Sequence, residues 1–324
     1  MKKSLWVRLL TAVLCVGWGL LFLRGETTEK SMMRFLYAGR TRQGSEVILW
    51  YQAPEAAADA ADASGALQCV QAEGTTLELA LAQAQRMLPQ TADYRLCDYL
   101  LVPQQDAAQL LSEYEQLVLE LACGRTAARV CCTELSGEML RQLCSGQERF
   151  ADKLLEKLQQ HSGQMPRLYQ HRESLLLPLL ECTENGAGFA EEMLLQTAEE
   201  QRVLPPNEAQ MALLLCTAPG TRTFWLDGQQ LELRRCSVSV AMEGAQALLR
   251  LDAQPEAGTP QPTAAQSAAL ARLAEQAVET FWQQGTDWLS LRARTMLQDS
   301  AGGESWTTKN ACPKIRADVR FVRF

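Results

Sequence analysis

The C-terminal residues 264–324 predict a long helix followed by a final strand. Apolar residues recur at helical spacing from Ala264 to Leu297, and Gly285 is predicted to kink or end the helix. From Ile315 to Phe324 apolar and charged residues alternate, which is the pattern of a half-buried strand. The apolar set is Ile315, Ala317, Val319 and Phe321, and the charged set is Arg316, Asp318 and Arg320. A sheet edge or face is therefore expected to receive the C-terminus.

Two hairpins are predicted before this helix. Their turns, Asp227-Gly228 and Glu243-Gly244, each contain a glycine, which supplies the positive φ that tight hairpin turns require. The result is an antiparallel meander, linked by the Pro- and Thr-containing residues 255–263 to the long helix. Packing of that helix on the meander predicts an α+β domain.

The N-terminal half predicts a sheet covered by helices. Residues 31–52 read as a hairpin and residues 55–64 as a surface loop, and Thr75 with Glu78 forms a capping box at the start of a helix. Strands are expected over Tyr94–Val102 and Ala127–Thr133, with a helix between them over Ala107–Ala122. From Ser136 to Leu180 the pattern becomes helical.

These patterns give a multidomain α+β chain with mixed or antiparallel sheets covered by helices. The expected divisions are a membrane anchor or signal segment over 1–24, an N-terminal α/β domain over 25–135, a helical middle region over 136–182 and a C-terminal α+β domain over 183–324. A length of 324 residues with 47% hydrophobic residues suffices for two or three cores.

The N-terminus carries a membrane-targeting signal. Lys2 and Lys3 precede an uncharged apolar run, Leu9–Leu23, between Arg8 and Arg24. As a helix this run would span about 22 Å, less than the roughly 30 Å of a hydrocarbon core, so a signal peptide and a short anchor both remain open. No small-residue cleavage site follows the run, which favours an uncleaved anchor.

The net charge limits the classes of partner that this chain can bind, and the cysteine pattern indicates the state of its thiols. The net charge of −7 and the absence of a basic stripe argue against nucleic acid. Eleven cysteines at irregular spacings, many within apolar runs, are interpreted as buried free thiols. Cys131 and Cys132 are adjacent in a predicted strand and therefore point to opposite faces.

No catalytic, cofactor or metal motif is found. The sequence lacks GxSxG, P-loop, GxGxxG, SxxK, CxxC and HExxH patterns. His161 and His171 are interpreted as exposed surface residues, and paired glutamates such as Glu191 with Glu192 as solvated helix faces. Trp50 and Trp306 are the tryptophans least explained by packing, and they are candidates for partner contacts. No catalytic, cofactor-binding or metal-ligating residue is assigned, nor a small-molecule site.

The order of these elements resembles the Ger(x)C family, the C subunits of spore germinant receptors. The resemblance rests on the long helix, the turn Asp287–Leu291, a following Trp and the final strand, and upstream on Gly188–Ala190, Arg202–Glu208 and Met211–Cys216. It extends through Glu29–Pro54, Gly74–Glu78 and Tyr94–Val102, and it covers most of residues 25–324.

The resemblance implies a non-catalytic, membrane-anchored subunit that assembles with A and B membrane subunits on the outer face of the spore inner membrane. Family members are usually lipoproteins, and here Cys15 is the one nearby thiol, inside a poor lipobox in which Leu14 is bulky. Two alternatives stay open, namely an anchored solute-binding protein of a transporter and an exported cell-wall hydrolase.

Overall fold

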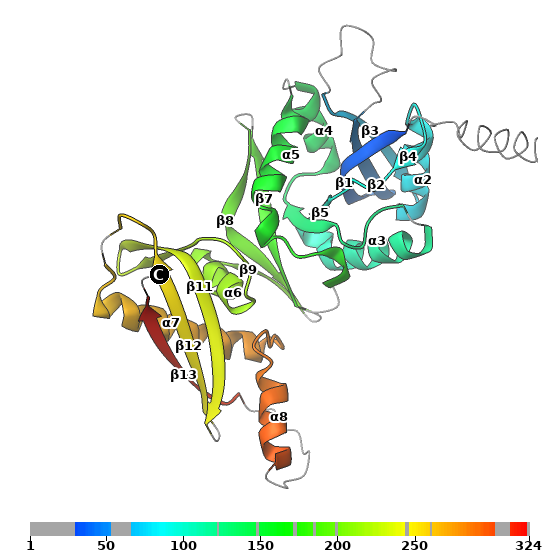
Figure 1. The fold of residues 1–324 in the computed structure, drawn as a ribbon. Helices are drawn as coiled ribbons and strands as arrows, with labels where there is room; N and C mark the ends of the chain where they lie inside the picture. Colours follow the sequence, from blue (N-terminus) through cyan, green and yellow to red (C-terminus); the bar gives the residue numbers. More distant parts are fainter. Residues whose placement is uncertain are drawn as a thin grey trace, which may run out of the picture.

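The computed structural model describes two β-sheets with their helices (Figure 1). The described residues are 30–52, 66–121, 123–146, 149–170, 174–183, 186–197, 200–243, 246–259, 261–301 and 312–322. The predicted anchor, the predicted loop 55–64 and Trp306 lie outside these ranges.

The first sheet is mixed and has nine strands, in the order β3-β2-β1-β5-β6-β7-β8-β9 with β4 beside β1. Neighbours among β1, β5, β6 and β7 run parallel, whereas β2 and β3 at one end and β8 and β9 at the other pair antiparallel. The strands are β1 (Ser31–Thr41), β2 (Gly44–Gln52), β3 (Gln68–Gly74), β4 (Ala92–Asp93), β5 (Tyr99–Pro103), β6 (Arg129–Thr133), β7 (Leu175–Thr183), β8 (Gly186–Gln196) and β9 (Gln201–Leu204).

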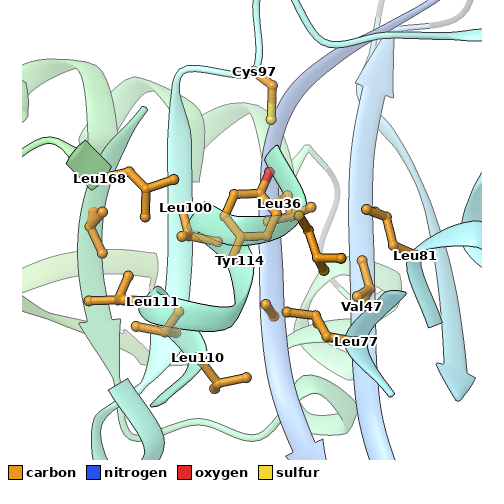
Figure 2. Close-up of a cluster of buried hydrophobic side chains, with 14 of the residues drawn as sticks. Leu36, Val47, Leu77, Leu81, Cys97, Leu100, Leu110, Leu111, Tyr114 and Leu168 are labelled. Carbon is orange, nitrogen blue, oxygen red and sulfur yellow. The ribbon is translucent and has the colours of Figure 1, made fainter. Parts of the chain in front are cut away.

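Helices cover both faces of this sheet. On one face lie α2 (Leu77–Met87) and α3 (Ala107–Leu121), and on the other α4 (Gly137–Gly146) and α5 (Phe150–Gln160). Strand alternation sends Leu100 and Val102 of β5 to the first core and Leu101 to the second. Figure 2 shows the first core, where Leu110, Leu111 and Tyr114 of α3 lie over β5 and β1. The predicted opposition of Cys131 and Cys132 is confirmed, because the two thiols lie in different cores.

The second sheet has four strands in the order β10-β11-β12-β13. They are β10 (Arg222–Leu226), β11 (Gln229–Glu243), β12 (Gln246–Pro255) and β13 (Lys314–Phe321). The predicted meander is confirmed, and at its first turn Asp227 and Gly228 both have positive φ, 51° and 75°. The final strand pairs with β12 in parallel, which the sequence pattern did not indicate.

Helices α6 (Pro206–Leu215) and α7 (Ala264–Gln283) pack on the inner face of this sheet. Thr263 caps α7 in a reciprocal capping box with Gln266, and the helix ends before Gly285, whose φ is 80°. The prediction that Gly285 interrupts the long helix is thus confirmed. A separate helix, α8 (Leu291–Ala301), follows and projects away from the two sheets (Figure 1).

The predicted fold class is confirmed, but some element bounds were wrong. The first long helix is capped by Thr76, which accepts from the Leu79 amide at 3.3 Å, and not by Thr75. Either of the two adjacent threonines could cap a helix, so the sequence alone does not select between them. Packing does, because a helix that starts at Leu77 places Ala80, Leu81 and Ala84 in the core. The strand predicted over 94–102 begins only at Tyr99.

The prediction of helix up to Leu180 was also wrong, because Leu175–Thr183 forms β7. A central strand buried on both faces is apolar at every position, so its sequence cannot be told from a buried helix by period. Pro178 lies beside a register shift in the β7–β8 pairing, a place where a sheet tolerates proline. The first sheet therefore runs through 136–182 and ends with β9 at Leu204; the domain boundaries given above stay predictions.

Candidate interaction surface

The outer face of the second sheet is open to solvent. Its inner face packs on α6 and α7, and residues 235–243 of β11 alternate between exposed and partly buried. Ser237, Ser239 and Ala241 of β11 are exposed on this face, with exposed charges of both signs on β11, β12 and β13. Those charges are Glu243, Arg250, Lys314, Arg316, Asp318 and Arg320.

The pairing of β12 with β13 places charged residues of this face opposite one another. Arg250 of β12 lies opposite Asp318 of β13, and Asp252 lies opposite Arg320. Arg320 also pairs with Asp318 along the strand, with Nε to Oδ2 at 3.1 Å. Because the side chains of Arg320 and Asp318 are about half exposed, this pair contributes little to stability and stays available to a partner.

Side chains from the helices occupy backbone groups of β10 and β13, whereas residues 235–243 of β11 lie beyond the β10 pairing and among the described strands pair with β12 alone. At β10, the Asn207 amide accepts from Trp225 N at 2.8 Å and donates to Trp225 O at 2.7 Å. At β13, Ala317 N donates to Glu275 Oε1 at 2.8 Å, and Ser267 Oγ donates to Val319 O at 3.3 Å. Such capping discourages strand addition at β10 and at β13.

The exposed helix α8 adds apolar side chains to this part of the molecule. Leu297 is 67% exposed and Met296 41%. At the start of the helix Asp287 accepts from the amides of Leu291 and Arg292, at 2.7 and 2.8 Å. The Arg292 guanidinium lies over Trp282 at 4.8 Å from the ring centroid, a cation–π contact that fixes the helix start against α7.

A buried polar cluster lies at the start of α4. The Glu46 carboxylate is 4% exposed and accepts from Gly137 N at 3.1 Å, Gln71 Nε2 at 3.2 Å and Tyr37 OH at 3.4 Å. Burial is the main cause that raises the pKa of Glu46, and the pKa of the Tyr37 hydroxyl is raised by burial and by the Glu46 charge. These contacts make Glu46 a cap for α4 that ties the helix to β2.

The residues singled out from the sequence are scattered. Cys15, His171 and Trp306 lie outside the described residues. Trp50 was wrongly expected at a surface: it is fully buried and stacks on Phe35 with ring centroids 4.5 Å apart. His161 is partly buried, with its ring 4.7 Å from that of Phe189 and its Nδ1 3.1 Å from Lys157 O, and is not the freely exposed residue expected.

Sequence reasoning missed Glu46, Asn207 and Glu275. Glu46 precedes the apolar run Val47–Trp50 and carries no motif, and its burial depends on α4, which is about ninety residues away. Asn207 follows two prolines at the start of α6. A polar residue at a helix start is ordinary, so the sequence did not indicate a special role for it. The role of its side-chain amide becomes visible only in the structure, where it bonds to the backbone of Trp225 in β10.

Among the described residues, no group of three or more His, Cys, Asp or Glu side chains is placed to hold a metal ion. Within the same ranges, each helix is too short or too polar to cross a membrane. Ten of the eleven cysteines are described, and all ten are free thiols.

Comparisons with known proteins return one solved structure. It is the crystal structure of the GerBC protein. The two structures share 11% sequence identity with a TM-score of 0.43, and the match covers 88% of this chain and 96% of GerBC. No family model matches the chain, and no curated protein does.

Proposed function

We propose that this chain is the non-catalytic, membrane-anchored C subunit of a spore germinant receptor. In this role it assembles with the A and B membrane subunits on the outer face of the spore inner membrane and helps to trigger nutrient-induced germination. Residues 1–24 act as the anchor, or Cys15 carries a lipid in their place.

The observation that carries this proposal is the order of elements in the C-terminal part. A short helix follows β9, then come the meander β10–β12, the long helix α7 and the strand β13. This is the order in which the sequence resembles the Ger(x)C family. The first sheet, with β1 and β2 followed by α2 and β5, keeps the order of the N-terminal part of the resemblance.

The open face of the second sheet is the surface proposed to contact the A or B subunit. It combines small residues on β11 with charges of both signs, and helix side chains occupy backbone groups of β10 and β13. Small residues allow close approach of a partner, while the charges set its orientation. Assembly needs no catalytic group from this chain.

The test is a pull-down of the tagged full chain from detergent-extracted membranes of sporulating cells, with mass spectrometry of the co-purifying proteins and of the N-terminal peptide. We expect A-type and B-type receptor subunits and an unmodified Met1–Arg24 peptide. Recovery of an ABC permease would favour a solute-binding protein, and recovery of no membrane partner would overturn the receptor proposal.

A matched pair of variants tests the surface. Ser239→Lys places a new charge on the open face, and we expect it to reduce recovery of the partner subunits. Gln83→Lys adds the same charge on the exposed side of α2 and should leave recovery unchanged. If both variants recover the partners equally well, the contact lies elsewhere on the molecule.

A further inference from the structure

A polar cavity lies where the first sheet meets the second unit. Its volume is about 440 Å³, within the range of small-molecule pockets. The walls come from the segment 163–170 before β7, from the start of β7, and from the end of α6 with the loop that follows it. The two units are joined at this place by a hydrogen bond of 2.8 Å from Thr286 Oγ1 to Ser174 Oγ.

The charged residues that line the cavity are both arginines, Arg129 and Arg167. The Arg129 guanidinium donates to the backbone carbonyls of Ser162 and Met165, and Arg167 is exposed. Within the described ranges neither guanidinium is paired with a carboxylate. Unpaired arginines that meet in a cavity are unexpected in a chain of net charge −7.

A third arginine lies directly behind the wall. Arg222 is 1% exposed and donates to the carbonyl of Ala218, to that of Thr221 at 3.0 Å and to that of Pro219 at 3.3 Å. Ala218 and Pro219 themselves line the cavity. In the part of the chain that is described, carbonyl dipoles alone offset this buried charge, so its field extends into the cavity through a wall of low dielectric.

The remaining wall suits an organic group. Trp288 and Leu213 contribute apolar surface, and Tyr169 is 49% exposed at the cavity. Gln164 and Ser174 add neutral hydrogen-bonding groups. An aromatic and aliphatic wall opposite guanidinium groups is suited to a molecule that has an apolar body and an anionic end.

We propose that this cavity binds a small organic anion, whose carboxylate or phosphate is held by Arg167 and Arg129 and whose apolar part lies against Trp288. The guanidinium fork of each arginine matches the two oxygens of a carboxylate or phosphate. Binding would join residues of both units around one ligand, and it is independent of the receptor function proposed above.

Titration of the purified full chain in detergent with benzoate tests the proposal, with tryptophan fluorescence and calorimetry as readouts. Benzamide, which has the same shape without the charge, is the matched control ligand, and phenyl phosphate separates phosphate from carboxylate preference. We expect saturable binding of benzoate or phenyl phosphate that weakens with added salt, and no comparable binding of benzamide.

Variants locate the site. Arg167→Gln should weaken binding about tenfold or more, because a hydrogen bond to a charged group is lost. Arg167→Lys, which keeps the charge without the fork, should weaken it less. Arg86→Gln removes an exposed arginine at the end of α2 and should leave binding unchanged.

Unchanged thermal unfolding of the Arg167 variants would show that the fold is kept. Binding of benzoate that is not saturable, that equals binding of benzamide, or that survives Arg167→Gln and Arg129→Gln together would overturn the proposal.

Discussion

Glu46 shows how one buried carboxylate fixes the position of a helix. Its oxygens lie so close to Gly137 that a Cβ at this glycine would overlap Oε2. The carboxylate also accepts from the Gly137 amide, so it cannot move away without losing the cap. Glycine is therefore required at Gly137 by space, although its backbone is helical.

We expect Gly137→Ala to destabilise the protein by about 1–3 kcal/mol through this overlap. The matched control is Gly146→Ala at the other end of α4, where an added Cβ has no neighbour within 4 Å and should be neutral or slightly stabilising. Urea unfolding of both full-length variants, followed by circular dichroism, checks the difference. Equal effects would mean that Glu46 moves aside freely.

The Glu46 carboxyl should make stability depend on pH. Burial raises its pKa above the value in the unfolded chain. Its contribution to stability is therefore full below the unfolded pKa, about 4.3, and is lost as pH rises through the folded pKa. We expect the stability of the natural protein relative to Glu46→Gln to fall as pH rises from about 4 to about 7, measured by urea unfolding at each pH. A constant difference would contradict this.

At the scale of elements, Asn207 carries out a task that is normally left to a neighbouring strand. Its amide makes the two backbone bonds that a further strand would make at Trp225. This arrangement fixes α6 against β10 and ends the sheet on that side.

Asn207→Ala should cost about 1–2 kcal/mol, because two hydrogen bonds at the edge are lost. Asn207→Asp keeps the acceptor for Trp225 N but sets a charged oxygen against Trp225 O, so it should cost at least as much. Chemical unfolding of both variants, with light scattering to detect association through the freed edge, checks the order. An Ala variant as stable as the natural protein would show that water replaces both bonds.

The glycine that ends α7 offers a second test on an element. Gly285 has a φ of 80°, a conformation that costs other residues about 1 kcal/mol. Gly285→Ala should lower the free energy of unfolding by about this amount, and Gly285→Asn by less, because Asn tolerates this region. Thermal unfolding of the two variants measures the difference. Equal losses would point to a cause other than backbone conformation.

Local chemistry decided which elements could be predicted. The hairpin at Asp227, the end of α7 at Gly285 and the alternation of β13 follow from turn residues and period, and they were predicted. The strand β7 was not, because five buried leucines around Pro178 have no period. The polar cluster around Glu46 and the arginine cavity bring together residues far apart in the chain, so no local pattern could indicate either.

At the scale of the whole molecule, the described cysteines are buried or partly buried free thiols. The pKa of the Cys97 thiol is raised to about 12 by burial, and that of Cys182 to about 12 for the same reason. Since the thiolate is the reactive form, the folded protein should react slowly with iodoacetamide near neutral pH. The ten described thiols lie free in both units.

We expect the urea unfolding midpoint to be the same with and without reductant, and alkylation to become fast only when the chain unfolds. Mass spectrometry after brief labelling at pH 7 checks this, and the partly exposed Cys69 and Cys312 should be labelled first. A midpoint that falls when reductant is added would show that the folded protein contains a disulfide, and it would contradict the assignment of free thiols.

The parallel pairing of β13 with β12 sets an order for folding during synthesis. Residues 256–313 separate the two strands, and α7 caps β13 on its far side through Glu275 and Ser267. While the ribosome is still adding residues 314–321, β12 has one edge without a partner, and α7 has nothing to cap. A chain that ends within α8 would therefore present a bare edge of β12 to chaperones or to another copy.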